Sequence, residues 1–334
     1  MKTVLALMPA AFAESNGGRP ERLSRQPGFE IGFDSILVFS KFTAQLVQQV
    51  RKWLPSNTVA WVKRKRNLRR KRRFANLRSR MIKKHGNFTA KELVTACRMA
   101  GVQEGCILFV QCSYDDLLTY KGTPYDLLSG LRELVGPQGT LLMPAYTTNM
   151  WDTPCRPFDV LREPTYTGIL PELFRREDGV VRSLHPRHSI CGLGPHAGEL
   201  LAGHEECVYA DGPDSPFDRI RKLDGAQSVC LGLRPGFHSF VHWVEDIEPE
   251  KYPIPMHEGP FDCLLRDANG KEIQRPFYRR PRRQRNQDVL IGKNLGPDAM
   301  RPLQFHGVWL CFYTWPALAS ELLALRDRGI VCFV

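Results

Sequence analysis

The stretch that decides the fold is TAKELVTACRMAGVQEGCILFVQCS, residues 89–113. Its first half predicts a helix, because Thr89 suits an N-cap and Glu92 follows three residues later, as in a capping box. Its second half, Cys106–Ser113, is an apolar run typical of a buried strand. A helix followed by a buried strand is the building unit of a layered α/β protein.

The alternation of helix and strand continues along the chain. Helical patterns occur at 123–136, with Pro124 in the first turn and Gly136 past the end, at 167–178 and at 316–328. Strand patterns occur at 139–148, 227–233, 305–314 and 329–334. After Asp246 a hairpin pattern begins, in which Asn269-Gly270 suits a type I′ turn. We expect an α/β fold, with a layered α/β/α core around a mixed central sheet and a C-terminal β-hairpin region.

The N-terminal quarter differs in composition from the rest of this 334-residue chain. Residues 1–91 contain 21 Lys and Arg against 4 Asp and Glu, whereas residues 92–334 contain 26 against 31. Residues 14–32 are polar and rich in Gly and Pro, which is typical of disorder. Residues 33–54 have the apolar spacing of an amphipathic helix. We therefore predict a basic, partly disordered N-terminal extension over 1–85 and a folded domain over 86–334.

The basic segment at residues 62–84 contains thirteen Lys or Arg and no acidic residue. Such a run is compatible with weak contact to an anionic membrane surface or to nucleic acid. It is equally compatible with a solvated helix that binds nothing, or with a stretch upstream of a start at Met81. The sequence leaves these alternatives open. No run approaches the roughly 18 apolar residues of a membrane-spanning helix.

Ten cysteines are scattered without any C-x-x-C pair. Five of them lie in apolar, strand-like runs, which predicts reduced core thiols: Cys106, Cys112, Cys230, Cys263 and Cys332. The opening MKTVLALMPAAFAES has features of a signal peptide, but its apolar part is short and contains Pro9. We expect a reducing compartment and a cytoplasmic location.

The stretch RSLHPRHSICGLGPHAGEL (Arg182–Leu200) supports two interpretations. Gly192, Gly194 and Ala197 match the spacing of a dinucleotide-binding turn, but the apolar strand that must precede such a turn is missing. His185, followed by Pro186, lies in extended backbone and is a candidate general base. A capping or surface histidine is the alternative. The histidine is the better candidate for chemistry.

A second constellation follows the strand pattern at 227–233. If residues 237–246 are helical, His242 and Glu245 share one face, so the carboxylate can orient the imidazole. No third ligand at helical spacing supports a metal site, and H-E-x-x-H is absent. A G-x-S-x-G elbow is absent too. Cys112, at a strand end, is a candidate thiol nucleophile or a buried structural thiol.

Several motifs between Thr89 and Val334 resemble, in order, those of the aminoglycoside 3-N-acetyltransferases. They include GPQGTLLMPAYT (136–147), the segment from Phe158 to Ala197 with its Arg-Ser-x-His-Pro-x-x-Ser, DGPDSPFDRI (211–220) and FHSFVHWVED (237–246). Residues 1–85 match nothing in that family. The resemblance implies an acyltransferase that moves an acetyl group from acetyl-CoA to an amine of an aminoglycoside or related aminosugar, the activity behind antibiotic resistance.

The resemblance also implies which residues form the site. His185 matches the catalytic base and Glu245 its acidic partner, with His242 beside them. The acetyl-CoA end is matched by Cys112, Ser113, Tyr146, Thr147 and Ser183, and the cationic acceptor by Asp159, Asp214, Ser215 and Glu245. A neutral imidazole oriented by a carboxylate is a suitable group to take a proton from an amine. Acetyl-CoA is the implied co-substrate, and no metal is required.

At three places, this chain differs from the motifs of that family. Gln111-Cys112 replaces His-Ser, Ala145 replaces Thr, and Asp214 stands where Gly is common. These changes leave the base intact but alter the acetyl-CoA end and the acceptor loop. Two alternatives therefore stay open: an aminosugar N-acetyltransferase of surface-polysaccharide or natural-product biosynthesis without drug-resistance activity, or a catalytically weakened member that docks through its basic N-terminal segment. A homodimer is a further expectation.

Overall fold

The computed structural model describes residues 56–150, 155–280 and 287–333. It separates two compact units, Met1–Arg70 and Lys71–Val334. The described part of the first unit belongs to α2 (Ser56–His85), a thirty-residue helix. The predicted signal-like start, the disordered stretch at 14–32 and the amphipathic helix at 33–54 lie outside the described residues.

The second unit begins at Lys71, whereas the sequence suggested a boundary at residue 85. The difference arises because the last turns of α2 contact this unit. Arg78 donates a hydrogen bond to the backbone oxygen of Tyr120 (3.0 Å), and the His306 ring nitrogen Nδ1 bonds to the backbone oxygen of His85 (2.8 Å). These contacts anchor the C-terminal end of the basic helix.

A seven-stranded mixed sheet forms the centre of the second unit, in the order β4-β5-β2-β1-β6-β10-β9. The three central strands are parallel: β2 (Thr140–Pro144), β1 (Ile107–Cys112) and β6 (Gln227–Leu231). The outer pairs are antiparallel and contain β4 (Val181–Arg182), β5 (Ile190–Leu193), β9 (Met300–Phe305) and β10 (Val308–Thr314). The predicted mixed sheet is confirmed.

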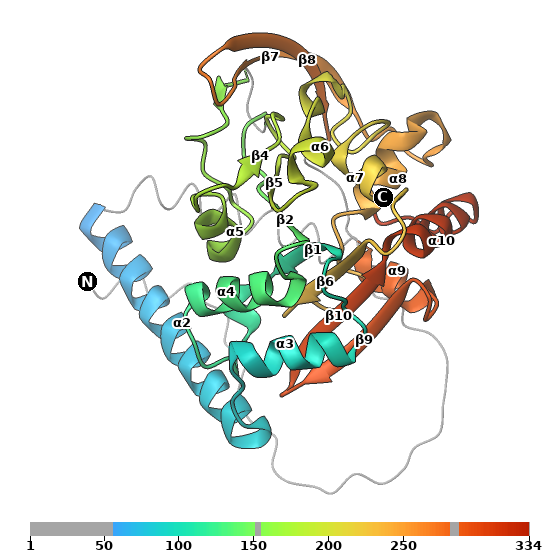
Figure 1. The fold of residues 1–334 in the computed structure, drawn as a ribbon. Helices are drawn as coiled ribbons and strands as arrows, with labels where there is room; N and C mark the ends of the chain where they lie inside the picture. Colours follow the sequence, from blue (N-terminus) through green and yellow to red (C-terminus); the bar gives the residue numbers. More distant parts are fainter. Residues whose placement is uncertain (1–55, 151–154, 281–286, 334) are drawn as a thin grey trace, which may run out of the picture. The chain divides into compact units, whose positions relative to one another are not determined.

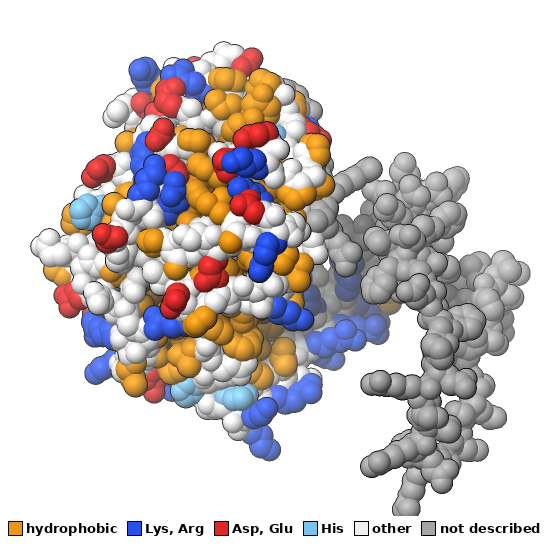
Figure 2. Space-filling model, turned by 90° about the vertical axis from the view of Figure 1, so that its right-hand side faces the viewer, with side chains coloured by type: hydrophobic (Ala, Val, Ile, Leu, Met, Phe, Trp, Pro, Cys, Tyr) orange, Lys and Arg blue, Asp and Glu red, His pale blue; other side chains and the backbone are white. Residues whose placement is uncertain are grey.

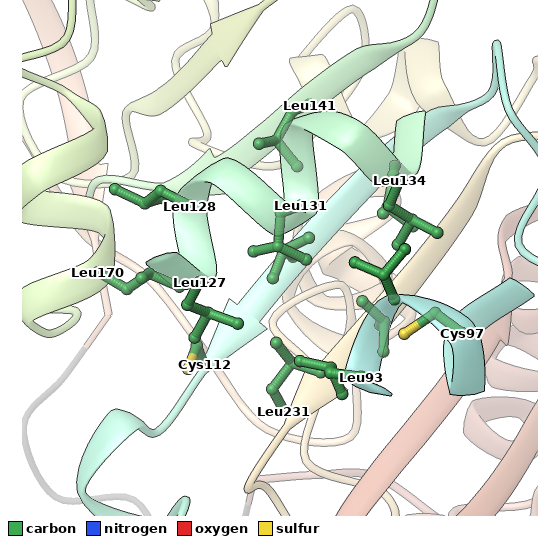
Figure 3. Packing of buried hydrophobic residues seen from close by; sticks show 14 of the residues in the cluster. Leu93, Cys97, Cys112, Leu127, Leu128, Leu131, Leu134, Leu141, Leu170 and Leu231 are labelled. Carbon is green, nitrogen blue, oxygen red and sulfur yellow. The ribbon is translucent and has the colours of Figure 1, made fainter. Parts of the chain in front are cut away.

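Helices cover both faces of the sheet, as Figure 1 shows. Alternate residues of β1 enter two different cores: Leu108 and Val110 join one, and Phe109 joins the other. The first core contains α3 (Ala90–Met99) and α4 (Pro124–Val135), whose leucines point towards the sheet in Figure 3. The second contains residues of α7, α8, α9 and α10. The α/β/α layering predicted from the alternation is therefore confirmed.

The helix ends follow the local signals in the sequence. Thr89 and Glu92 form a capping box at α3, and Thr123 and Asp126 form another at α4, which ends at Gly136 with φ +68°. The remaining helices are short except the last: α5 (Ile169–Phe174), α6 (Ala197–Leu201), α7 (Pro216–Ile220), α8 (Val241–Ile247), α9 (Asp288–Asn294) and α10 (Trp315–Asp327), with 3₁₀ turns at Tyr114–Asp116, His204–Glu206 and Pro249–Lys251.

A second sheet of three strands contains the predicted hairpin. It consists of β3 (Phe158–Asp159), β7 (Glu258–Arg266) and β8 (Glu272–Arg279). The predicted type I′ turn at Asn269-Gly270 is wrong, because only Gly270 has a positive φ and Asp267 N bonds to Lys271 O across a longer loop. Positive φ at both central positions instead occurs at His306 (+48°) and Gly307 (+74°), between β9 and β10.

Two cysteine predictions also change. Cys263 on β7 forms a disulfide with Cys155, so it is not a reduced thiol; the segment leading into β3 brings Cys155 alongside β7. Cys332 lies in a bend rather than in a strand. The other eight cysteines remain thiols, and seven of those eight are buried. The cytoplasmic location stays a prediction.

A long stretch of α2 presents positively charged side chains to solvent. All side chains from Arg64 to Arg80 are exposed. On the face drawn in Figure 2, by contrast, Lys and Arg are interspersed with Asp and Glu. None of the helices in the described residues has both the length and the apolarity needed to span a bilayer.

Candidate active site

The carboxyl ends of β1, β2 and β6 share one edge of the sheet, where open α/β sheets bind their ligands. The loop after β6 leads at this edge into α8. Gln111 near the end of β1 fixes that loop: its Nε2 donates to Ser239 Oγ (2.7 Å) and its Oε1 accepts from Ser239 N (2.9 Å). The departure at Gln111 therefore has a structural role, which is to anchor Ser239 in the loop that leads into α8.

The helix α8 pairs His242 with Glu245, as their spacing predicted. His242 Nδ1 lies 2.9 Å from Glu245 Oε2. Because an ionised carboxylate only accepts hydrogen bonds, the imidazole donates through Nδ1–H. In the neutral ring, Nε2 then carries a lone pair, which is the arrangement of a general base.

His242 is the more exposed of the two partly accessible histidines in this region, since the His257 side chain, paired with Asp246, is 11% exposed. The His242 side chain is 19% exposed, whereas that of Glu245 is fully buried. It lines a cavity of about 60 Å³ together with Phe237, His238, Ser239 and Phe333, among others. The Phe333 ring stacks on the imidazole, with centroids 5.3 Å apart. The backbone at the cavity requires a glycine at Gly236, whose φ is +87° and whose Cβ would meet Asp288 O.

A buried cluster of charges surrounds the pair. Arg280, which follows β8, donates from Nε to Glu245 Oε2 (2.5 Å) and from Nη2 to Asp246 Oδ1 (2.7 Å) and Asp211 Oδ2 (3.3 Å). Burial raises the pKa of Asp211 to about 6, while Arg280 and His257 hold the pKa of Asp246 well below its usual range. The guanidinium of Arg280 thus offsets much of the negative charge of these buried carboxylates.

His188 belongs to the same cluster. Its Nδ1 lies 2.7 Å from Asp211 Oδ2, and its ring stacks on Tyr146 (4.5 Å) and lies 5.4 Å from that of His242. Burial lowers the pKa of His188 well below its usual value, so the ring is neutral. His188 is only 3% exposed, and its contacts support the neighbouring residues.

The structure places His185 differently from the expectation. Its Nδ1 accepts from the backbone N–H groups of Arg187 (3.2 Å) and His188 (3.0 Å), and its ring is fully buried between His204 (4.6 Å) and Phe277 (4.8 Å). Burial lowers its pKa well below the usual value. No hydrogen bond joins His185 to Glu245: among the described residues the side chains bonded to Glu245 are those of His242 and Arg280, and the role of His185 as the base stays a prediction.

The residues expected at the acetyl-CoA end have other local partners. Thr147 donates to Pro186 O, and Ser183 Oγ accepts from Ile190 N and bonds to His204. Burial raises the pKa of the Cys112 thiol, which opposes its use as a thiolate nucleophile. Ser113 is half-buried and donates to Asp116 (2.5 Å). Of this group, including the buried Tyr146, only Ser113 retains partial access to solvent.

The predicted acceptor residues have different local partners. Asp159 caps the chain after β3 and pairs with Arg266 of β7. Ser215 caps α7 by accepting from Asp218 N. Asp214 is exposed, with a φ of +60°. Glu245 alone is in contact with the candidate base.

The glycines of 182–200 serve packing. β5 runs antiparallel to β2, unlike the parallel strand of a dinucleotide-binding turn. A Cβ on Gly192 would lie 2.7 Å from Leu142, and one on Gly194, whose φ is +125°, would lie 2.2 Å from Gly139 O. Within the described residues, no group of three or more His, Cys, Asp or Glu side chains is arranged to hold a metal ion.

Sequence reasoning missed Arg280 and the role of Asp246. Arg280 stands in YRRPRR, and nothing in such a basic run distinguishes a buried guanidinium from solvated ones. Asp246 directly follows Glu245, and only its position on α8 shows that it bonds to Arg280 and His257.

Known proteins of similar sequence indicate the family of this chain. The family model described as aminoglycoside 3-N-acetyltransferase matches residues 109–293. Aminoglycoside N(3)-acetyltransferase IV of a Salmonella species is 30% identical over 168 residues, which is 50% of this chain and 62% of that protein. Type IX of Micromonospora chalcea is 31% identical, over 53% of this chain and 67% of its own length. The chain thus spans 62 to 66% of the length of the type IV and type III enzymes that it matches.

Solved structures share the fold. Aminoglycoside acetyltransferase AAC(3)-Xa superposes with a TM-score of 0.63 at 20% identity, covering 76% of this chain and 98% of the other. The structure titled AAC-IIIb binary with CoASH gives 0.61 at 20% identity, covering 72% and 97%. At these identities the likeness establishes the fold, and the family model supplies the membership. The chain belongs to the aminoglycoside 3-N-acetyltransferase family.

Proposed function

We propose that this protein transfers the acetyl group of acetyl-CoA to an amine of an aminoglycoside or related aminosugar, with His242 as the general base. The observation that carries the proposal is the His242–Glu245 pair, which leaves Nε2 as an acceptor on a cavity at the carboxyl edge of the sheet. Two relatives support the substrate classes: AAC-IIIb was solved with CoASH and AAC-VIa with sisomicin.

The reaction follows from this arrangement. A sugar ammonium first loses a proton to solvent, because only the neutral amine has a lone pair. The amine nitrogen then attacks the thioester carbonyl carbon while His242 Nε2 takes a second proton from it. The C–N bond forms, the C–S bond breaks, and the leaving thiolate receives the proton from the imidazolium. Glu245 stabilises the imidazolium while it exists.

The cavity constrains how the substrates sit. Its volume of about 60 Å³ holds about two water molecules, so it has room only for the reacting groups. The bulk of the sugar and of the acyl carrier lies outside it. Ser113, at the end of β1, is the residue predicted for the acetyl-CoA end that remains accessible, and it stays a proposal for that role.

The test is a thiol-release screen with acetyl-CoA across aminoglycosides and simple amino sugars. We expect one CoA thiol per acetylated amine, with no release when the reactive amine of the same acceptor is already acetylated. Release with amino sugars but not with aminoglycosides would identify a biosynthetic enzyme without drug-resistance activity. Failure of every acceptor would contradict the proposal in favour of a catalytically weakened member.

The basic helix permits a separate prediction, on contact of residues 62–84 with an anionic membrane surface or nucleic acid. Replacing the five consecutive basic residues 69–73 with Gln is expected to weaken salt-dependent binding to anionic vesicles or duplex DNA by about tenfold or more, because each exposed Lys or Arg contributes roughly 1 kcal/mol at a charged surface. Cosedimentation and a mobility shift distinguish the two. Equal binding by the variant would show that the helix is merely solvated. A homodimer likewise stays a prediction.

A further inference from the structure

Arg280 is a buried arginine to which the reaction described above assigns no role. It follows β8 directly and is only 6% exposed. Besides Glu245, Asp246 and Asp211, it donates to the backbone oxygen of His242 (3.1 Å). Arg280 thus touches both members of the proposed catalytic pair, the carboxylate through its side chain and the histidine through its backbone.

The contact with Glu245 is the decisive one. Arg280 Nε and His242 Nδ1 both bond to the same oxygen, Oε2, at 2.5 and 2.9 Å. The other oxygen of Glu245, Oε1, is buried and has no hydrogen-bond partner. A buried carboxylate without a cation beside it tends to take up a proton or to attract one onto its neighbour. Arg280 is the group that opposes both outcomes.

We propose that Arg280 is a positioning residue for the acetyl transfer: it keeps Glu245 ionised and fixed in the orientation that holds His242 with its proton on Nδ1 and its lone pair on Nε2. This inference rests on the proposed function. Arg280 acts through Glu245 and does not touch the reacting atoms.

Other charged and titratable groups surround His242 and set the background for this effect. His188 comes from the loop before β5, and Asp211 from the turn before α7. Asp246 lies on α8, and Tyr252 in the segment after it. Asp288 starts α9, and Cys332 lies in the C-terminal segment. Asp288 is paired with Arg234, and Asp246 with His257. Arg280 is the guanidinium that bonds to Glu245, so its removal leaves that carboxylate without its cation.

The charge balance gives the direction of the effect. Without Arg280, the uncompensated Glu245 carboxylate stabilises a proton on His242, because opposite charges attract strongly in a buried site. The imidazole is then already protonated at pH values where the wild-type ring is a base. The acid limb of the kcat/KM profile should therefore move to higher pH, and kcat should fall more than KM rises.

The experiment compares Arg280→Met and Arg280→Lys with the matched control Arg279→Met. Arg279, the last residue of β8, directly precedes Arg280 but pairs with Glu258 and the backbone of Met150, outside the cluster. For thiol release between pH 5.5 and 9, we expect Arg280→Met to lose about tenfold in kcat/KM on the acid side, as for a shift of one pH unit. The loss should be smaller near pH 9 and partly recovered in Arg280→Lys. Arg279→Met should keep the wild-type profile.

A double variant separates positioning from a general structural role. If Arg280 acts through Glu245, adding Arg280→Met to Glu245→Gln should cost little more than Glu245→Gln alone. Both variants leave Asp211 and Asp246 without Arg280, so the comparison is made on kcat per folded molecule, and the charge-preserving Arg280→Lys keeps the inference testable if Arg280→Met does not fold. Additive losses, or an unchanged pH profile in a folded Arg280→Lys, would overturn the inference.

A measurement without substrate keeps the inference independent of turnover. In protein labelled with ¹³C-histidine, the His242 resonance should titrate at higher pH in Arg280→Lys than in the wild type or in Arg279→Met. An identical titration would overturn the positioning role. If the His242 resonance is displaced in Arg280→Lys but the wild type acetylates no acceptor, the proposed function alone is contradicted.

Discussion

Replacing His242 with alanine is expected to lower kcat for CoA thiol release by about 10²–10⁴-fold, the usual contribution of a general base. The reason is positional: His242 is the ring that combines a carboxylate partner, Glu245, with partial exposure at the cavity. KM should change little, because the imidazole acts mainly on the proton transferred in the transition state. Steady-state thiol release over a range of acceptor concentrations provides the measurement.

Two variants serve as comparisons for His242→Ala. His196 is exposed at the start of α6, and His196→Ala should stay within about twofold of the wild type, as expected for a surface change. His185→Ala should destabilise the protein but retain kcat per folded molecule, because that ring is fully enclosed by His204 and Phe277. Full turnover in His242→Ala, together with loss in a folded His185→Ala, would restore His185 as the base.

Replacing Phe217 with alanine should lower the free energy of unfolding by about 3–5 kcal/mol, the usual cost of removing a buried aromatic ring. Phe217 is fully buried and makes ring contacts with Phe109 (5.4 Å), Phe240 (5.7 Å) and Trp315 (5.5 Å). The residues around it are packed from β1, α7 and α10, so the cavity cannot close without moving several elements. Urea denaturation followed by circular dichroism measures the loss.

We expect Phe217→Ala to disturb the candidate active site as well. Phe240 directly precedes α8 and stacks on Trp243 at 5.1 Å, so the aromatic cluster holds the helix that carries His242. The matched control is Tyr125→Ala on α4, a ring that is 62% exposed and should cost no more than about 0.5 kcal/mol. Equal stability of Phe217→Ala and Tyr125→Ala would show that this cluster does not form a packed core.

Much of the fold was readable from local patterns. The capping box at Thr89, the helix marked by Pro124 and Gly136, and the apolar run before Ser113 depend on residues that are neighbours in the chain, and the structure has them where they were expected. The turn chemistry was less readable. A histidine at positive φ is uncommon, so the turn at His306-Gly307 carried no signal, whereas Asn269-Gly270 carried one that the strand register overrode.

The candidate site divides in the same way. His242 and Glu245 lie three residues apart on α8, so their pairing follows from helix geometry alone. The orientation of His185 depends on His204 and Phe277, which are distant in sequence, and the burial of Arg280 depends on where β8 ends relative to α8. Neither can be read from neighbouring residues.

The amino-acid sequence by itself determined the order of helices and strands, the mixed α/β class and one imidazole–carboxylate pair, because periodicity, capping and i,i+3 spacing act over a few residues. The tertiary structure alone decided which histidine reaches a cavity, which cysteine forms a disulfide and which arginine neutralises the buried carboxylates. Those outcomes depend on burial and on charges contributed by distant segments, and both exist only once the sheets and helices have packed together.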